Sequence, residues 1–172
     1  MSETSVLADD VSSHVVAMAT GWFDACDGRA PLYGAYHAPA DGAIRGVAVL
    51  CPPLGLEMMI AHRTMRLLAD RLAAAGFGAL RLDYAGRGNS LDAEAPSEVS
   101  EWVTGVRDAV ACARRSGAGS IVLVGMRAGA LLAAAAAEGC GPLDALVLWD
   151  PCASGKAYLR EQSEILARIQ AE

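Results

Sequence analysis

The chain has 172 residues, of which 53% are hydrophobic, and its formal net charge is -6 at pH 7. A chain of this size can bury one substantial core, so we expect a single globular domain and neither a disordered nor a repeat protein. No apolar run reaches the roughly 18 residues that a membrane helix requires, and the negative charge argues against nucleic acid as a partner.

The N-terminal residues predict no transport signal. Residues 1–12 lack a basic stretch followed by an apolar core, so no signal peptide is visible and we expect a cytoplasmic protein that does not bind membranes. Their serines and the pair Asp9-Asp10 are typical of a flexible lead-in. We therefore expect one domain, over residues 13–172.

Two strands are expected to open this domain. They span about residues 15–23 and 32–37, and Asp27-Gly28 between them is a hairpin turn signal. A third run, residues 46–51, is continuously apolar, as in a strand that is buried on both faces, and Pro52-Pro53 ends it. The first pair therefore predicts an antiparallel edge beside a more deeply buried strand.

The rest of the chain alternates helices with short apolar strands. Apolar residues at three- and four-residue spacing predict a helix over 62–75, which Gly76 ends, and Ser97 or Ser100 is placed to cap the next helix. This alternation predicts an α/β fold: a mostly parallel sheet of about six strands with helices on both faces. The remaining elements are expected as strands over 77–82, 121–124 and 145–149, and as helices over 97–116, 128–138 and 155–171.

Cysteines and glycines give no sign of a metal or cofactor. The five cysteines are an odd number without a C-x-x-C pair, so neither a disulfide framework nor a zinc site is indicated. The segment Gly125 to Gly129 lacks the spacing of dinucleotide and phosphate loops, and Gly86-Arg87-Gly88 is too short a match. We expect no cofactor, and we expect the cysteines to be small buried hydrophobes: Cys26, Cys51, Cys112, Cys140 and Cys152.

The segment Ser120 to Ala130 has the layout of a nucleophile elbow. A buried strand runs through the turn Gly125-Met126-Arg127-Ala128-Gly129 into an alanine-rich helix. A hydrolase carries serine at the centre of this turn, where Arg127 stands here. The chain's three histidines also precede the elbow, whereas that architecture supplies its catalytic base after it: His14, His37 and His62.

Together with two further motifs, this segment resembles the α/β-hydrolase superfamily over roughly residues 30–152. Val47 to Gly55 is similar to its third strand and oxyanion loop, and Asp83 to Ser90 matches its D-x-x-G-x-G-x-S turn. The branch most similar is that of bacterial serine-aminopeptidase-like or exosortase-associated hydrolases, through the Pro-Pro-Leu-Gly-x-Glu loop Pro52 to Glu57 and the following His62-Arg63. Some members of that branch also carry arginine in the elbow.

The resemblance implies a hydrolase of small esters, amides or thioesters. Its oxyanion donors would be the N–H groups of Ala128 and of Leu54 or Gly55, because Pro53 has no N–H. Arg127 cannot replace the serine, since a guanidinium stays protonated and does not attack carbonyls. We therefore expect the chain, on its own, not to be competent as a serine hydrolase.

An arginine at the start of a helix needs an acidic partner. It meets the positive end of the helix dipole at a cost of about 0.3 to 1 kcal/mol, and burial would add to this. The expected partners are Glu57, Asp83, Asp150 or an anionic ligand. Arg127 is thus either part of a structural ion pair or a ligand-binding residue.

Other residues near these motifs have a chemical and a structural interpretation. Asp150 stands where some members of the fold place the catalytic acid, but it could equally cap the turn that follows. Cys51 and His62 could form a thiol site, although a cysteine at the end of a buried strand is more typical of a core. We expect His62 near the start of its helix and Ser90 in a structural turn.

The chain stops before the last strands and cap that the superfamily usually adds, so we expect a truncated form of its fold. Residues 145–149 then form an apolar sheet edge that the last helix or another chain must cover. Three functions follow: a shortened hydrolase, a pseudo-enzyme that binds an anionic small molecule at Arg127, or an interaction subunit. The last would pair at this edge with a second copy or a partner chain.

Overall fold

The computed structural model describes residues 17–25, 29–39, 42–91 and 99–170. Several expectations lie outside these ranges, namely the flexible residues 1–12, the Asp27-Gly28 turn and the cap at Ser97. Among the helices that the structure describes, none has the length and apolar character needed to cross a bilayer.

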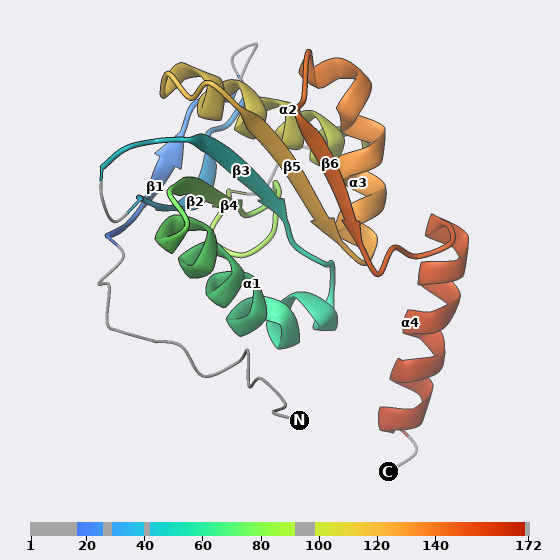
Figure 1. The fold of residues 1–172 in the computed structure, drawn as a ribbon. Helices are drawn as coiled ribbons and strands as arrows, with labels where there is room; N and C mark the ends of the chain where they lie inside the picture. Colours follow the sequence, from blue (N-terminus) through green and yellow to red (C-terminus); the bar gives the residue numbers. More distant parts are fainter. Residues whose placement is uncertain (1–16, 26–28, 40–41, 92–98, 171–172) are drawn as a thin grey trace, which may run out of the picture.

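A six-stranded mixed sheet forms the centre of the domain, in the order β1-β2-β4-β3-β5-β6 (Figure 1). β1 pairs antiparallel with β2 and β2 antiparallel with β4, whereas the remaining pairs are parallel. The predicted mostly parallel sheet with an N-terminal antiparallel pair is therefore confirmed. The strands are β1 Met18–Phe23, β2 Leu32–His37, β3 Gly46–Cys51, β4 Phe77–Leu82, β5 Ile121–Met126 and β6 Ala145–Trp149.

Helices pack on both faces of this sheet. α1 (Leu56–Ala74) covers one face, and α2 (Val99–Arg115) and α3 (Ala128–Ala137) cover the other (Figure 1). The residues of β3 alternate between these two layers. Ala48 and Leu50 belong to the hydrophobic cluster under α1, whereas Val47 and Val49 belong to the hydrophobic cluster under α2 and α3. Because successive strand residues point to opposite faces, a strand between two helix layers must be apolar throughout.

The first helix begins earlier than its apolar pattern predicts. α1 starts at Leu56, directly after Gly55, and not at His62. Met59 and Ile60 are 76% and 80% exposed, so the first two turns carry no buried apolar stripe that a periodicity argument could detect. This early start places Glu57 in the first turn of α1, near the end of the sheet at which the parallel strands finish. Ser100 lies within α2 and so is not the predicted cap.

The last helix does not cover the sheet edge. α4 (Gly155–Gln170) extends away from the C-terminal ends of the strands (Figure 1), and Tyr158 is its one buried residue in the described chain. Leu159 and Leu166, predicted on its buried side, are exposed, and so are all five residues of β6. A short 3-10 helix, Glu138–Cys140, precedes β6.

A buried histidine connects β2, β4 and α1. His37 is fully buried; its Nδ1 lies 2.7 Å from Asp70 Oδ1, and Arg81 Nε donates to its Nε2 at 3.1 Å. Because arginine only donates, Nε2 must accept, so the proton lies on Nδ1 and the ring is neutral. Burial lowers the pKa of His37 below its ordinary value, and the hydrogen bond to Asp70 only partly opposes this.

This pKa shift predicts a loss of stability in mild acid. Both folded and unfolded chains hold a neutral His37 above its unfolded pKa of about 6.5. As the pH falls below that value, the unfolded chain binds the proton first, so the free energy of unfolding decreases. Denaturant unfolding between pH 7.5 and pH 5.5 measures this decrease.

The variant His37→Gln should be less stable at pH 7.5 by about 1 to 3 kcal/mol, because a buried hydrogen-bonded network is disrupted, and its pH dependence should be flatter. An equal slope in wild type and His37→Gln would show that His37 is not the titrating group.

Candidate functional site

The elbow forms as a tight turn between β5 and α3. Arg127 has φ 55° and ψ -121°, and it is one of two non-glycine residues with positive φ in the described chain. Its N–H donates to Trp149 O at 3.0 Å, and its own carbonyl accepts from Ala130 at 3.1 Å. These bonds hold a conformation that costs a non-glycine residue of order 1–3 kcal/mol.

The glycines of the turn are required by close packing. A Cβ on Gly125 would lie 2.5 Å from Ala130 Cα, and a Cβ on Gly129 would overlap the carbonyl oxygens of Cys51 and Pro52. These neighbours are backbone atoms that cannot move aside. The G-x-x-x-G spacing therefore lets α3 pack directly against the end of β3 and the loop after it.

Arg127 lies at the centre of an ion-pair cluster. Its Nη2 is 3.1 Å from Glu57 Oε1 and 2.6 Å from Glu161 Oε2, and its Nη1 is 3.4 Å from Asp150 Oδ2. Glu57 also accepts from Gln162 Nε2 at 3.1 Å. The cluster thus joins the elbow to α1, to the end of β6 and to α4.

Two of the three acidic partners expected from the sequence are present. Glu57 and Asp150 contact Arg127, whereas Asp83 accepts hydrogen bonds from Asn89 in its own turn. Glu161 was not anticipated, because no local pattern indicates that α4 folds back to the elbow. The side chains of Arg127 and Glu57 are only 19% exposed, so this contact is partly desolvated.

The cluster carries an excess of negative charge. One guanidinium faces three carboxylates, so its formal charge is -2. The hydrogen bonds that Arg127 donates to Glu57, and then to Glu161, raise the pKa of Arg127 further above its ordinary value. Glu57 Oε2 is buried without a hydrogen-bond partner in the described residues. Arg127 therefore stays charged and acts as neither nucleophile nor base.

The predicted oxyanion donors lie at one cavity. Leu54, Gly55 and Ala128 all line a space of about 760 Å³ between the oxyanion loop and the helices α2, α3 and α4. Tyr158 from α4 donates to Leu54 O at 2.9 Å, which fixes the loop, and burial raises the pKa of this hydroxyl. Ala128 is the first residue of α3, where backbone N–H groups have no partner within the helix.

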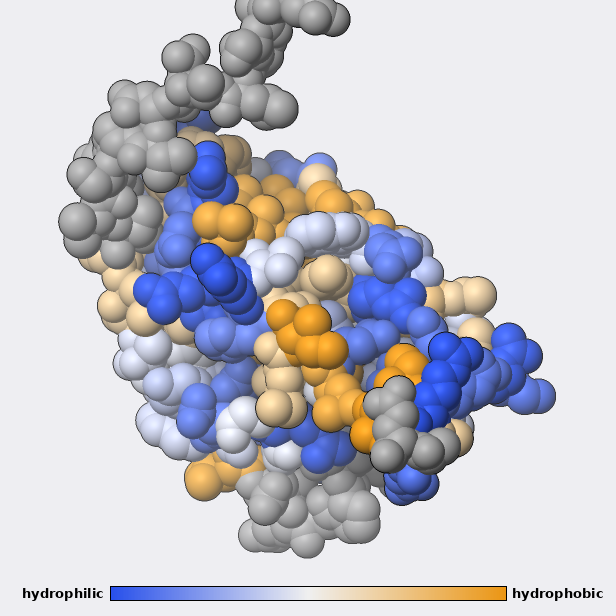
Figure 2. Space-filling model, turned by 90° about the horizontal axis from the view of Figure 1, so that it is seen from below, coloured by the Kyte–Doolittle hydropathy of each residue, from blue (hydrophilic) through white to orange (hydrophobic). Residues whose placement is uncertain are grey.

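The walls of this cavity are mainly apolar. Its lining includes Leu131 and Leu132 of α3, Leu159 and Leu166 of α4, and Trp102 of α2. Figure 2, seen from the end at which the parallel strands finish, shows hydrophobic residues exposed among charged ones on this side of the molecule. A cavity of this size and lining is typical of a small-molecule site.

The other chemical candidates do not meet at the elbow. His37 belongs to the buried network described above, and His62 is exposed with its Nε2 3.4 Å from Arg81 Nη1, so neither described histidine contacts Arg127. Cys51 is fully buried, and burial raises the pKa of its thiol far above the ordinary value. The predicted alternative of a Cys51 thiol site is therefore wrong, because a reactive thiolate cannot form there.

The remaining two candidates have structural contacts. Asp150, whose side chain is 69% exposed, faces Arg127 and orients no described histidine. Ser90 donates to Asp83 O at 2.7 Å and accepts from the Tyr33 N–H at 2.9 Å, so it ties its turn to β2. This is the structural role that was expected of Ser90.

Comparison with known proteins identifies the fold. No family model and no curated protein matches the chain. Among solved structures it is similar to an α/β serine hydrolase without a lid from Xanthomonas campestris (TM-score 0.66, 22% identity, covering 80% of this chain and 63% of that one). An esterase from Pyrococcus furiosus is similar at a TM-score of 0.67 and 16% identity, covering 81% of this chain and 51% of that one.

A third neighbour is Est1E from Butyrivibrio proteoclasticus, solved with ferulic acid bound (TM-score 0.65, 22% identity, covering 77% of this chain and 53% of that one). The chain has the α/β-hydrolase fold, and it spans between half and two thirds of the length of these three structures. At these identities the likeness establishes the fold alone.

The ion-pair cluster predicts that Arg127 holds α4 in place. In Arg127→Met, Glu161 loses its partner and Glu57 keeps only Gln162, so amide hydrogen exchange in α4 should become about tenfold faster. Exchange measured by mass spectrometry tests this. Arg63→Met removes an exposed guanidinium elsewhere and should leave α4 unchanged; equal exchange in both variants would contradict a tethering role.

Proposed function

We propose that this chain is a non-catalytic α/β-hydrolase-fold domain that binds a small neutral acyl compound in the cavity beside the elbow. The observation that carries this proposal is the arrangement at the elbow: the Arg127 side chain is bound by three carboxylates, while its neighbour Ala128 and Gly55 of the oxyanion loop line an apolar cavity of about 760 Å³. The described elbow has no serine at its central position, and room for a ligand remains beside it.

The backbone around the cavity supports an acyl ligand. Ala128 is the first residue of α3, so its N–H has no partner within the helix, and both Ala128 and Gly55 line the cavity. A ligand carbonyl can accept from such groups, as a transition-state oxyanion does in hydrolases. The apolar walls would then take the hydrocarbon part of the molecule.

The charge of the site favours a neutral ligand over an anionic one. All three guanidinium nitrogens of Arg127 face carboxylate oxygens, and the cluster's formal charge of -2 would repel a second anion. Arg87 is the one cationic residue among those that line the cavity, and its guanidinium lies over the Trp102 ring at 5.3 Å. Binding of an anion at Arg127 is therefore the less favoured alternative.

The Pro52 to Glu57 loop also supports the finer relationship to the serine-aminopeptidase-like or exosortase-associated branch. The glutamate that ends this loop motif is the residue that pairs with the elbow arginine. The loop glutamate Glu57 and the elbow arginine Arg127, the two features that resemble that branch, therefore form an ion pair with each other. The cytoplasmic location remains a prediction from the sequence.

The test compares binding with hydrolysis. Octanamide should bind the purified chain in isothermal calorimetry, and octanoate should bind more weakly, whereas p-nitrophenyl octanoate should be hydrolysed at the background rate. Arg127→Ser and Arg127→Ala should also show only background hydrolysis, because no described histidine lies at the elbow to activate a serine.

Leu159→Asp places a charge in the cavity wall and should weaken octanamide binding by about tenfold or more. Leu67→Asp, at an exposed leucine of α1, is the matched control. Tighter binding of octanoate than of octanamide would favour the anion-binding alternative. Hydrolysis by the wild type that Arg127→Ala abolishes would overturn the proposal.

A second candidate role is self-association through β6. Four of its apolar residues are 40–45% exposed, and β6 pairs with β5 alone among the described strands. An open apolar edge without a charged residue readily accepts another strand. We propose that β6 pairs with β6 of a second copy of the chain. The four residues are Leu146, Val147, Leu148 and Trp149.

Val147→Lys should weaken this dimer by about tenfold or more, because a charge at the edge opposes strand pairing. Native mass spectrometry over a concentration series measures the effect. Leu67→Lys adds the same charge to α1 and should leave the dimer intact. A monomeric wild type at high micromolar concentration would contradict pairing between two copies and would point to a different partner chain.

A further inference from the structure

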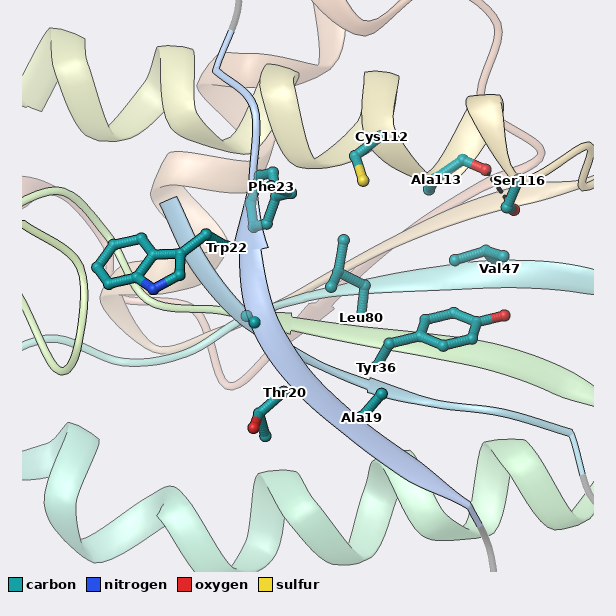
Figure 3. A pocket seen from close by; sticks show the side chains of 12 residues that line it. Ala19, Thr20, Trp22, Phe23, Tyr36, Val47, Leu80, Cys112, Ala113 and Ser116 are labelled. Carbon is teal, nitrogen blue, oxygen red and sulfur yellow. Dashed lines mark hydrogen bonds between the residues drawn. The ribbon is translucent and has the colours of Figure 1, made fainter. Parts of the chain in front are cut away.

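A second cavity lies on the far side of the sheet from α1, under the N-terminal strands. It has a volume of about 320 Å³ and is enclosed by β1, β2, the centre of the sheet and the last turns of α2. In Figure 3, Phe23 and Leu80 point from the sheet toward α2, and Cys112 points back from α2. The cavity shares no lining residue with the larger one beside the elbow.

Missing side chains create this space. Gly21 of β1 stands directly opposite Gly34 of β2, so two neighbouring positions of the sheet carry no side chain. A Cβ on Gly21 would meet no atom within 4 Å, although Gly34 is tightly surrounded by Leu80 and Phe23. Glycine weakens a strand, so a glycine with open space above it, such as Gly21, commonly marks the close approach of another group.

One polar group in the wall has no partner. The Tyr36 hydroxyl is buried, and it makes no hydrogen bond to any described residue. It lies over Gly78 of β4, where any side chain would collide with it. Burial raises the pKa of Tyr36, so the group stays protonated and can donate. A buried unsatisfied hydroxyl costs of order 1–3 kcal/mol. An acceptor in the cavity recovers this cost by displacing the atoms that cover the oxygen.

The lining indicates the kind of ligand. Phe23 and Tyr36 present aromatic rings to this space, and the Cys112 sulfur lies across from Phe23 (Figure 3). Aromatic rings and sulfur interact favourably with a further ring. The volume is near the lower end of the range for ligand pockets, of roughly 300 to 1,000 Å³. A molecule of one or two fused rings therefore matches the space.

We propose that this cavity binds a small flat aromatic molecule that carries a hydrogen-bond acceptor for the Tyr36 hydroxyl. The site is independent of the acyl cavity and of any chemistry at Arg127. Its specificity comes from the single donor at Tyr36, and its affinity comes from the apolar walls.

Quinoline and naphthalene are matched probes, because they share a shape and differ in one acceptor nitrogen. Quinoline added to the 15N-labelled chain should shift the amide signals of Gly21, Gly34 and Cys112 in NMR spectra. Tyr36→Phe keeps the ring but removes the donor, so it should weaken quinoline binding by about two- to tenfold and leave naphthalene binding unchanged.

Gly21→Val fills the open space and should abolish binding of both probes. Because valine favours strands more than glycine does, this variant should also have a higher thermal stability. Gly119→Val, at an exposed glycine whose Cβ would also meet nothing, is the control and should bind both probes normally. If Gly21→Val fails to fold, Tyr36→Phe still decides the question.

Three results would overturn the proposal. The first is the absence of shifts at Gly21 and Cys112 up to millimolar quinoline. The second is a set of shifts confined to Leu131 and Leu159 at the acyl cavity, which would instead support the proposed function. The third is equal quinoline affinity in wild type and Tyr36→Phe.

Discussion

The arrangement of the site depends on the interaction of Arg127 with Glu57 and Glu161. The guanidinium extends from a backbone held at positive φ and connects the elbow, the start of α1 and the last helix. Each partner is needed to offset the cost of placing a charge in a partly buried position at a helix N-terminus. Removing the arginine would leave Glu57, with one oxygen already unpaired, as an uncompensated carboxylate. The interaction is therefore worth more to the fold when intact than an exposed ion pair would be.

The elbow and the oxyanion loop keep their shape although arginine stands where a serine hydrolase has its nucleophile. The elbow turn still forms, because close packing of Gly125 and Gly129 against backbone does not depend on the central side chain. The oxyanion loop remains ordered through Tyr158 and its bond to Leu54. Nucleophilic attack requires a side chain that can be deprotonated and a base beside it, and neither is present at this turn in the described chain. The geometry of the turn is thus retained without a serine at its centre.

The sequence predicts the sheet and the bounds of the last helix well but the packing of that helix poorly, for physical reasons. β3 and β5 are buried on both faces, so their apolar runs mark them without ambiguity, and the elbow motif fixes the turn to α3. The start of α1 could not be found, because its first turns bury no apolar stripe. Glu161 could not be found either, since the approach of α4 to the elbow depends on tertiary contacts between segments 34 residues apart. The spacing of apolar residues predicts which face of a helix is buried. It does not predict where a helix docks through polar side chains.

The position of α4 and the binding of a ligand in the cavity beside it are coupled. In the described chain its contacts with the rest of the molecule are largely polar, through Tyr158, Glu161 and Gln162, while Leu159 and Leu166 face the cavity beside α3. A ligand between α3 and α4 would bury these leucines and so favour the docked position of the helix. Binding and docking must then strengthen each other by the same free energy, because linkage is reciprocal. Loss of the Arg127 ion pairs would consequently weaken ligand binding without any contact between that arginine and the ligand.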